Sequence, residues 1–403
     1  VLHSAHKIKA IPNEEVTLAE TLQSNGYATA FYGKAHLGSK PENWGFDEAT
    51  GGWYRSYHYP FNKSCTVPDG KEGDYLTDRF TDLAVDFIER HKDQPFYVHM
   101  AHFAVHDPIH GRKDLVEKYR KKLESMPETG GPEYILEGNP DGPILSEKRH
   151  RELTETDERA LHQNERVWWI KQKQDNVEFA GMVEAMDESL GRLRAKLEEL
   201  GLADNTNVIF TADNGGMSAS NQYRGINNTR EYRDTFFASS NLPLRGAKGW
   251  NYEGGIRVPL IVYWPGKTPS NQTSSMVVTG TDYYPSLLEM IGLDSMPEQH
   301  LDGQSFVPTL LGKQQERGPI YWHFPHYSNH GYQSPNGAIR DGDYKLIEYY
   351  ENQTVQLFDL KNDIGETNDL AQSQPEIANK LRKQLHAWRK AVDAKMPKRK
   401  KVN

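Results

Sequence analysis

The 403 residues include a single cysteine, Cys65, so the chain has no intrachain disulfide. No stretch approaches the roughly 18 consecutive apolar residues that a membrane span needs, and we expect no transmembrane helix. The formal net charge of -8 is mild for this length and is spread along the chain, so it gives no electrostatic footprint for nucleic acid. We interpret the basic cluster at residues 398–401 as a solvated end.

Length and composition indicate a globular protein with two domains. The chain is 36% hydrophobic, 26% charged and 11% aromatic, and it is too long for one minimal core. We expect a large α/β domain over residues 1–312 and a smaller domain over residues 313–403. The chain opens on Val1 with neither a methionine nor an apolar leader, and we interpret it as a fragment.

Helical and strand patterns alternate in the first half of the chain, which favours a mostly parallel sheet sandwiched by helices. Each of three units is an amphipathic helix followed by a short β-rich stretch. The helices are expected at residues 16–22, 77–90 and 177–200, and the strands at 27–32, 96–101 and 207–211.

Two regions depart from this alternation. The polar stretch from about 112 to 175 contains several Gly and Pro breakers, and we interpret it as an insertion on the sheet. From about residue 318 the pattern becomes short strands separated by turns, followed by a helix at about 375–392. This tail predicts a small antiparallel sheet capped by a helix.

Polar residues follow each of the three expected strands directly, where ligands bind in open α/β sheets. The first loop presents Lys34 and His36 between glycines, the second presents His106, and the third presents Asp213 with Asn214. Each feature alone is typical of an ordinary turn or a solvated loop. The hypothesis of a site depends on their meeting at one edge of one sheet.

A fourth loop, residues 245–255, adds the cations Arg245 and Lys248. Together the loops suit an anionic ester, because lysines neutralise the oxygens of a sulfuryl or phosphoryl group and histidines move protons. The oxygens of Asp213 and Asn214 suit calcium or magnesium, which need about six ligands, so further ligands must come from elsewhere. No activated nucleophile is recognisable, and Cys65 is interpreted as an ordinary thiol.

Residues 26–38 closely resemble the second signature of the formylglycine-dependent sulfatases, of the alkaline phosphatase superfamily. The likeness covers nearly the whole chain except the insertion. It continues at residues 104–108, 210–216, 243–249, 252–259 and 358–370.

The resemblance implies an alkaline-phosphatase-like fold, with residues 1–312 as the catalytic domain, and a calcium ion held by Asp213, Asn214 and two aspartates near the N-terminus. Those aspartates are absent here, as is the Cys or Ser-x-Pro-x-Arg motif whose first residue becomes formylglycine. The nucleophile is therefore expected outside this fragment, and the fragment itself is expected to be inactive.

The resemblance also implies a role for each cation. Lys34 would bind the sulfate and the formylglycine, and His36 would be the base that collapses the covalent sulfate hemiacetal. His106 and Lys248 would contact the ester oxygen and protonate the leaving alcohol. Two departures from the family pattern are Ala35, where tryptophan is usual, and Asp107, where a small or hydroxyl residue is common.

The C-terminal region resembles that of bacterial sulfatases acting on sulfated glycans, which implies a sulfated carbohydrate substrate and a periplasmic or secreted protein. Arg245, His326 and Arg340 are candidate substrate-binding residues, and Trp168 with Trp169 is a candidate sugar platform. For His326, Arg340 and the tryptophans, packing is an equal alternative. A phosphodiesterase or phosphonate monoester hydrolase of the same fold, and a noncatalytic glycan-binding relative, stay as competing readings.

Overall fold

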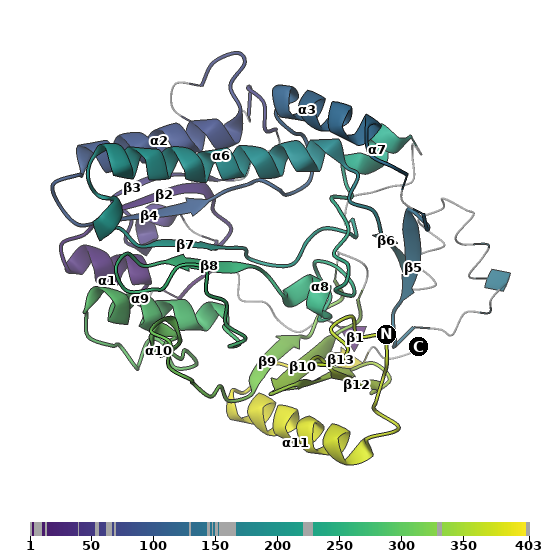
Figure 1. Ribbon diagram of the computed structural model, residues 1–403. Helices are drawn as coiled ribbons and strands as arrows, with labels where there is room; N and C mark the ends of the chain where they lie inside the picture. Colours follow the sequence, from purple (N-terminus) through teal and green to yellow (C-terminus); the bar gives the residue numbers. More distant parts are fainter. Residues whose placement is uncertain are drawn as a thin grey trace.

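The structure of the chain is a computed structural model. It describes residues 2–3, 10–12, 14–38, 40–52, 56–61, 67, 70–128, 130–142, 146, 148–149, 152, 167–220, 229–328 and 333–399. Helices lie on both sides of the strands of the larger region, and a second, smaller sheet with its own helix lies at one end (Figure 1). This is the expected α/β architecture.

A three-stranded parallel sheet in the order β3-β2-β4 forms the first part of the large region. β2 is Ala28–Lys34, β3 is Glu48–Gly52 and β4 is Phe96–Ala101, and both ladders run parallel. The short helix α1, Leu18–Ser24, precedes β2 and is closed by a capping box from Thr17. The predicted parallel sheet is therefore confirmed, and it places the carboxyl ends of β2 and β4 side by side.

Helices α2 (Leu76–Arg90), α3 (Lys113–Glu124) and α6 (Val177–Glu199) lie on one side of this sheet (Figure 1). Apolar side chains at helical spacing, such as Phe80 and Met182, are fully buried against Tyr32 of β2. The side chain of Arg112, just before α3, joins the helices, since it pairs with Asp78 of α2 at 3.3 Å and with Glu188 of α6 at 2.7 Å.

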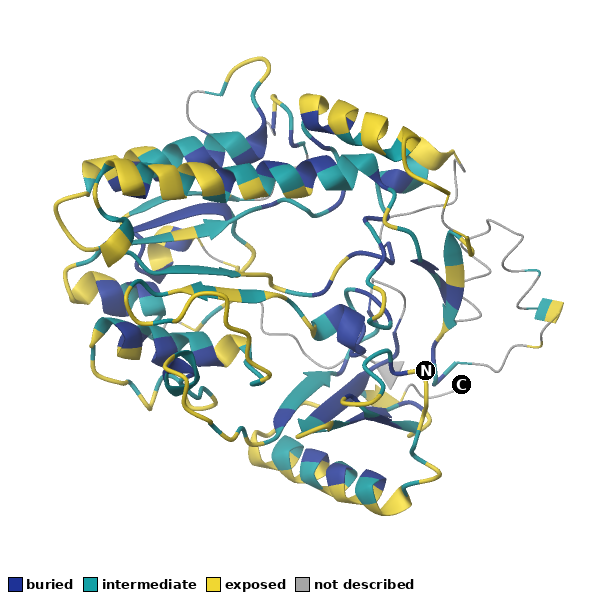
Figure 2. Ribbon diagram, in the orientation of Figure 1, coloured by how far each residue is buried: buried dark blue, intermediate teal, exposed yellow. Residues whose placement is uncertain are grey.

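The third expected strand pairs differently from the prediction. β7, Val208–Thr211, forms an antiparallel ladder with β8, Leu260–Tyr263, and within the described residues neither strand joins the parallel sheet. The alternation of helices and strands predicts that strands exist but not which strands pair. Both strands are only partly covered, and Ile261 is 61% exposed (Figure 2).

Short helices and turns complete the large region. Helix α9 lies beside the β7–β8 pair, and the Tyr283 hydroxyl at its start donates to Thr211 Oγ1 at 3.0 Å. These elements are η1 (Pro41–Trp44), η2 (Ala203–Asn205), α7 (Arg230–Asp234), α8 (Glu253–Ile256), η3 (Gly280–Asp282), α9 (Tyr283–Ile291) and α10 (Val307–Leu310). Among the described residues, no helix combines the length and apolar character needed to cross a bilayer.

The insertion contributes α3 and a separate antiparallel hairpin. β5, Tyr134–Gly138, pairs with β6, Val167–Lys171, and neither strand belongs to the main sheet. Most of the residues between the two strands lie outside the described part of the chain.

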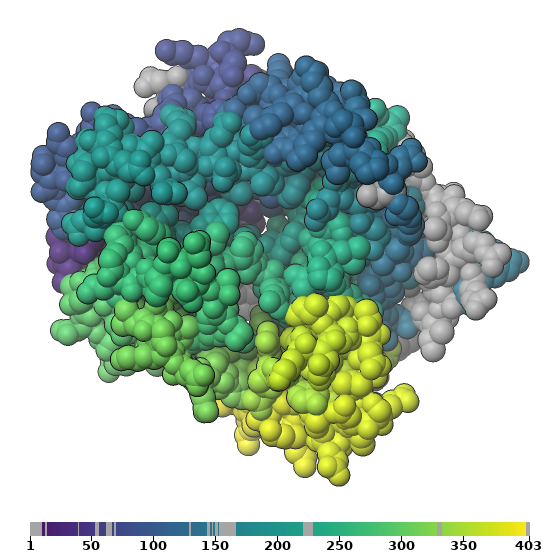
Figure 3. Space-filling model, viewed as in Figure 1, coloured from purple at the N-terminus to yellow at the C-terminus, as the bar shows by residue number. Residues whose placement is uncertain are grey.

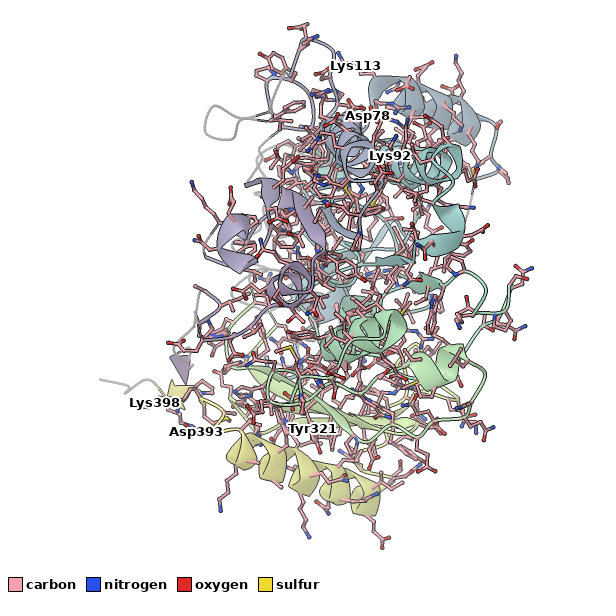
Figure 4. All side chains as sticks on the ribbon, turned by 90° about the vertical axis from the view of Figure 1, so that its left-hand side faces the viewer. Asp78, Lys92, Lys113, Tyr321, Asp393 and Lys398 are labelled. Carbon is pink, nitrogen blue, oxygen red and sulfur yellow. The ribbon has the colours of Figure 1, made fainter. Side chains whose placement is uncertain are left out.

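The C-terminal region is the predicted antiparallel sheet with a helix packed on it. The strands are β9 (Ile320–Phe324), β10 (Asn336–Asp341), β11 (Tyr344–Tyr349) and β12 (Val355–Asp359), in the order β12-β11-β10-β9. Helix α11, Pro375–Ala391, buries Leu381 and Leu385 against the sheet. Tyr321 of β9 stacks on Trp388 of α11 with ring centroids 4.7 Å apart, and Figure 4 shows Tyr321 directly beside this helix.

The two ends of the chain meet beside this region. β1, Leu2–His3, forms a short antiparallel ladder with β13, Lys398–Arg399, part of the basic cluster. In the space-filling view the C-terminal region packs against the segment that follows β7 (Figure 3). The boundary expected at residues 312 and 313 stays a prediction.

One carboxylate ties α11 to its sheet. Glu348 of β11 accepts hydrogen bonds from Arg382 Nε at 2.6 Å and Arg389 at 2.7 Å, and His386 lies 2.9 Å away. Burial would raise the pKa of Glu348, but the hydrogen bonds and charges of these residues together hold its pKa below the usual 4.5. A carboxyl with a lowered folded pKa stabilises the protein above its unfolded pKa, and this contribution is lost as the pH falls.

We therefore expect Glu348→Gln to lower the free energy of unfolding at pH 7 by about 1.5–3 kcal/mol, since it removes hydrogen bonds to charged groups. Urea unfolding at pH 7 and at pH 3 measures the effect. The difference from the wild type should shrink at pH 3, which is below the unfolded pKa, because the unfolded wild-type chain then binds a proton that folding must release. Glu298→Gln, at an exposed position, is the matched control and should change little. A difference that is equal at the two pH values would contradict the assignment.

Candidate active site

The close approach of β2 and β4 brings the first two loops together. Gly33 pairs with Ala101 across the parallel ladder, with φ of +132°. A Cβ added to Gly33 would lie 1.8 Å from the carbonyl oxygen of Ala101, so only glycine fits. Lys34 and the loop after Ala101 therefore start from adjacent points at the same edge of the sheet.

Lys34 is the half-buried last residue of β2, and His36, in the loop that follows, is exposed. The ammonium group of Lys34 lies 5.7 Å from the ring centroid of Phe103 in the second loop. Burial lowers the pKa of Lys34, while the carboxylates of Asp213 and Asp107 oppose this shift.

The pKa of His36 is lowered by its surroundings. Partial loss of hydration is the largest cause, and the positive charges of Lys34, His106 and Lys248 lower the pKa further. A histidine whose pKa falls is more often neutral at physiological pH, the form that accepts a proton. This is the state that the predicted role as a base requires.

Contacts of both its side chain and its backbone carbonyl hold His106 in place. Its Nδ1 lies 2.8 Å from the carbonyl oxygen of Asp107 and 2.6 Å from the Asp107 carboxylate. The Tyr57 hydroxyl donates to the carbonyls of His106 at 2.7 Å and Phe103 at 2.9 Å, which fixes the loop. Sequence reasoning noted Asp107 only as a departure from the family pattern; the residue order His-Asp was the signal for this contact.

Backbone hydrogen bonds join the third and fourth loops. The amide of Lys248 donates to Gly216 at 3.0 Å, and the amide of Gly215 donates to Gly255 at 2.9 Å. A Cβ on Gly255 would lie 2.1 Å from the carbonyl of Trp250, so the turn also requires glycine. Asp213 and Lys248 are thereby presented together.

Lys248 completes the group. Burial lowers its pKa, the charge of Lys34 lowers it further, and the carboxylates of Asp213 and Asp107 oppose the shift. Because each of the four loops contributes a group that acts on the charges of the others, Lys34, His36, His106, Asp213 and Lys248 form one electrostatic cluster. The structure brings these predicted residues together.

The donors of the third loop match a hard cation in type. Asp213 is exposed, and the Asn214 amide nitrogen donates to the Gly215 carbonyl at 3.0 Å, which leaves its side-chain oxygen as the atom that can bind a cation. Within the described residues no group of three or more His, Cys, Asp or Glu side chains is arranged to hold a metal. Two oxygen donors fit calcium chemically but fall short of the about six ligands it takes.

Arg245 lies in a network of its own. Its guanidinium contacts the Glu137 carboxylate at 2.7 and 3.4 Å, donates to the Glu366 carbonyl at 2.8 Å and lies 4.2 Å from the centroid of the Tyr252 ring. These contacts join the insertion hairpin, the fourth loop and the C-terminal region. A direct role for Arg245 in substrate binding stays a prediction.

The other candidate substrate contacts lie in the C-terminal region. His326 packs edge-on against Phe324, and Arg340 donates to the Gly342 carbonyl at 3.1 Å in the β10–β11 turn. Their roles also stay predictions. For Trp168 the alternative of packing holds, since it is 2% exposed and belongs to a buried cluster with Trp250 and Tyr349. Trp169 packs on Tyr134. Cys65 lies outside the described residues.

Comparison with known families identifies the family of the chain. The family model described as Sulfatase matches residues 2–293. The chain belongs to the sulfatase family. A second model, N-sulphoglucosamine sulphohydrolase, C-terminal, matches residues 247–391 of this sulfatase.

Individual relatives agree with this assignment. A sulfatase of Formosa agariphila is 29% identical over 448 residues, covering 93% of this chain and 69% of that protein. Arylsulfatase G of Rattus norvegicus is 26% identical over 414 residues, covering 93% of this chain and 70% of that protein. A solved structure described in complex with its substrate D-glucosamine-2-N,6-O-disulfate has a TM-score of 0.67 at 22% identity, covering 96% of this chain and 84% of that one.

A buried ion network, which sequence reasoning missed, supports the fourth loop of the sulfatase. Lys345 of β11 is fully buried and pairs with Glu253 at 3.0 Å and Glu366 at 2.6 Å. Glu366 also accepts from the Glu253 amide at 2.6 Å. A fully buried lysine is rare unless paired, but nothing local in the sequence indicates which partners it has.

Lys345→Met should lower the free energy of unfolding by about 3–5 kcal/mol, because it leaves two buried carboxylates without their cation. Urea unfolding at pH 7 measures the change. Lys380→Met is the matched control, since Lys380 is an exposed lysine of α11 whose ion pair with Asp341 spans 3.5 Å. It should cost less than about 1 kcal/mol. An equal loss of unfolding free energy in the two variants would show that the buried network stabilises the protein no more than an exposed ion pair does.

Proposed function

We propose that this chain is the larger part of a sulfatase that hydrolyses a sulfate ester on a sulfated carbohydrate, with a formylglycine nucleophile supplied by residues outside this chain. The observation that carries the proposal is the convergence of Lys34, His36, His106 and Lys248 on one another from three separate loops. The carboxylates of Asp213 and Asp107 offset part of the repulsion between the two lysines, and an anionic ester bound among the loops would offset more of it. A sulfate ester supplies such an anion.

Each of these four residues has a distinct role in this proposal. Lys34 and Lys248 bind the non-bridging sulfate oxygens and stabilise the negative charge that develops as the ester bond breaks. His106 donates a proton to the oxygen of the leaving alcohol. His36, neutral by virtue of its lowered pKa, accepts the proton whose removal releases sulfate.

Asp213 and Asn214 would hold a calcium ion together with ligands from outside the described residues. When bound, the ion would lower the cost of bringing the sulfate and the nucleophile together. The chemistry of the two oxygen donors supports calcium or magnesium rather than zinc.

A carbohydrate substrate is supported by the relatives. One structural neighbour is described with a disulfated glucosamine as its substrate, and the C-terminal region matches a model named for a sulphoglucosamine sulphohydrolase. In this proposal Arg245, His326 and Arg340 bind the sugar or a neighbouring anionic group. A glycan substrate outside the cell fits export to the periplasm or secretion, which fractionation of the full-length protein tests; recovery in the cytosol would contradict it.

The reaction is tested by assaying the full-length protein with 4-nitrophenyl sulfate, bis(4-nitrophenyl) phosphate and 4-nitrophenyl phenylphosphonate, alongside mass spectrometry for a formylglycine. We expect turnover of the sulfate in preference to both phosphorus esters, and a formylglycine residue. Preferred turnover of the diester or of the phosphonate ester would instead assign a phosphodiesterase or a phosphonate monoester hydrolase. Binding of sulfated saccharides without turnover would assign a noncatalytic glycan-binding protein.

Anion binding can be tested on the chain itself. Lys34→Met and Lys248→Met should each weaken the binding of inorganic sulfate by roughly 10- to 100-fold, because each removes charged hydrogen bonds of about 1.5–3 kcal/mol. Isothermal titration calorimetry measures the affinity. Lys361→Met is the control, since that lysine is 72% exposed and lies outside the cluster. If all three variants bind sulfate equally, the lysines do not form the anion site.

A further inference from the structure

Asp107 is an unusual residue at the cluster. It is only 2% exposed, and neither of its carboxylate oxygens accepts a well-aligned hydrogen bond from a described residue. Burying a carboxylate without hydrogen-bond donors is costly, so a compensating positive charge must lie close. Nδ1 of His106 lies 2.6 Å from its Oδ1.

The geometry around Nδ1 determines where His106 carries its proton. The carbonyl oxygen of Asp107 lies 2.8 Å from Nδ1, and a carbonyl can only accept. Nδ1 must therefore be the donor. A carboxylate oxygen of Asp107 also lies against Nδ1, so this oxygen and the carbonyl oxygen both favour a proton on Nδ1. The other ring nitrogen, Nε2, can then exchange a proton with a substrate.

The neighbours make this arrangement necessary. Lys34 and Lys248 lie close enough to Asp107 for its charge to act on both, and they oppose a third positive charge in the same space. An imidazole that donates a proton must first carry that charge. A carboxylate behind the ring offsets the repulsion from the lysines, and the Phe103 ring, with its centroid 5.7 Å away, limits how the imidazole can turn.

We infer that Asp107 is a positioning residue that orients His106 and fixes its proton on Nδ1, so that Nε2 is the atom that protonates the leaving alcohol. This inference rests on the proposed function. As the bond from sulfur to the alcohol oxygen breaks, its electron pair stays on that oxygen, and the Nε2 proton moves to it. The new bond to sulfur comes from the nucleophile, and the ring ends neutral with its proton still on Nδ1.

The tautomer is tested without any turnover. Long-range ¹⁵N–¹H spectra of the histidine-labelled chain, with His106 assigned from a His106→Gln variant, distinguish the two ring nitrogens. We expect Nδ1 to be protonated and Nε2 to be the nitrogen that loses its proton as the pH rises. Asp107→Asn removes the carboxylate but keeps the backbone carbonyl, so both resonances should shift part of the way toward an average of the two tautomers. A proton found on Nε2, with Nδ1 bare, would overturn the inference.

The catalytic consequence is tested on the full-length protein with aryl sulfates whose leaving phenols become steadily less acidic, from 4-nitrophenyl to 4-methoxyphenyl sulfate. A good leaving group needs little help from an acid, whereas a poor one depends on it. Asp107→Asn should lower kcat for the 4-methoxyphenyl ester at least about 10-fold more than for the 4-nitrophenyl ester, with KM little changed, since a general acid contributes about 10²- to 10⁴-fold in total.

Asp294→Asn is the control, because it makes the same change at an exposed position, and it should leave both rates unchanged. An equal loss on every ester in Asp107→Asn would overturn the inference and indicate a purely structural role. Absence of turnover by the wild type on all sulfates would count against the proposed function, while the spectra would still decide the tautomer.

Discussion

The contact between Gly33 and Ala101 is the constraint on which the site depends. Parallel pairing of β2 with β4 brings the two backbones so close that a side chain on Gly33 would overlap the Ala101 carbonyl. Lys34 follows immediately on one strand, and the loop that carries His106 follows on the other. Any residue larger than glycine would push the strands apart and separate the first cation from the histidine that acts with it.

The second half of the site is assembled by a different interaction. Hydrogen bonds between the third and fourth loops place Asp213 beside Lys248, and beneath them Lys345 pairs with two buried carboxylates. The C-terminal sheet lies beside α8 (Figure 1), and its buried lysine supports the fourth loop. The C-terminal region contributes no residue to the cluster, yet the buried ion pairs of Lys345 connect it to the fourth loop.

Local sequence patterns predicted the elements well because their physical causes are local. Strand β4 has the predicted bounds, and α6 ends one residue before the predicted end, since apolar periodicity and turn residues determine such segments. The α/β class, the antiparallel C-terminal sheet and the cation-bearing loops followed from the same reasoning.

What could not be predicted depends on contacts between distant segments. The antiparallel pairing of β7 with β8, the burial of Trp168 and the partners of Lys345 are all decided by which segments meet in the fold. The sequence shows that Asp107 follows His106 directly. It does not show that the carboxylate turns toward Nδ1, which depends on the folded loop.

The account as a whole claims that the four loops surround a single oxyanion. A crystal structure of the chain with inorganic sulfate tests this most directly. We predict one sulfate ion between the ammonium groups of Lys34 and Lys248, within hydrogen-bonding distance of both. A sulfate ion bound elsewhere, with these two ammonium groups on separate faces of the molecule, would contradict the account.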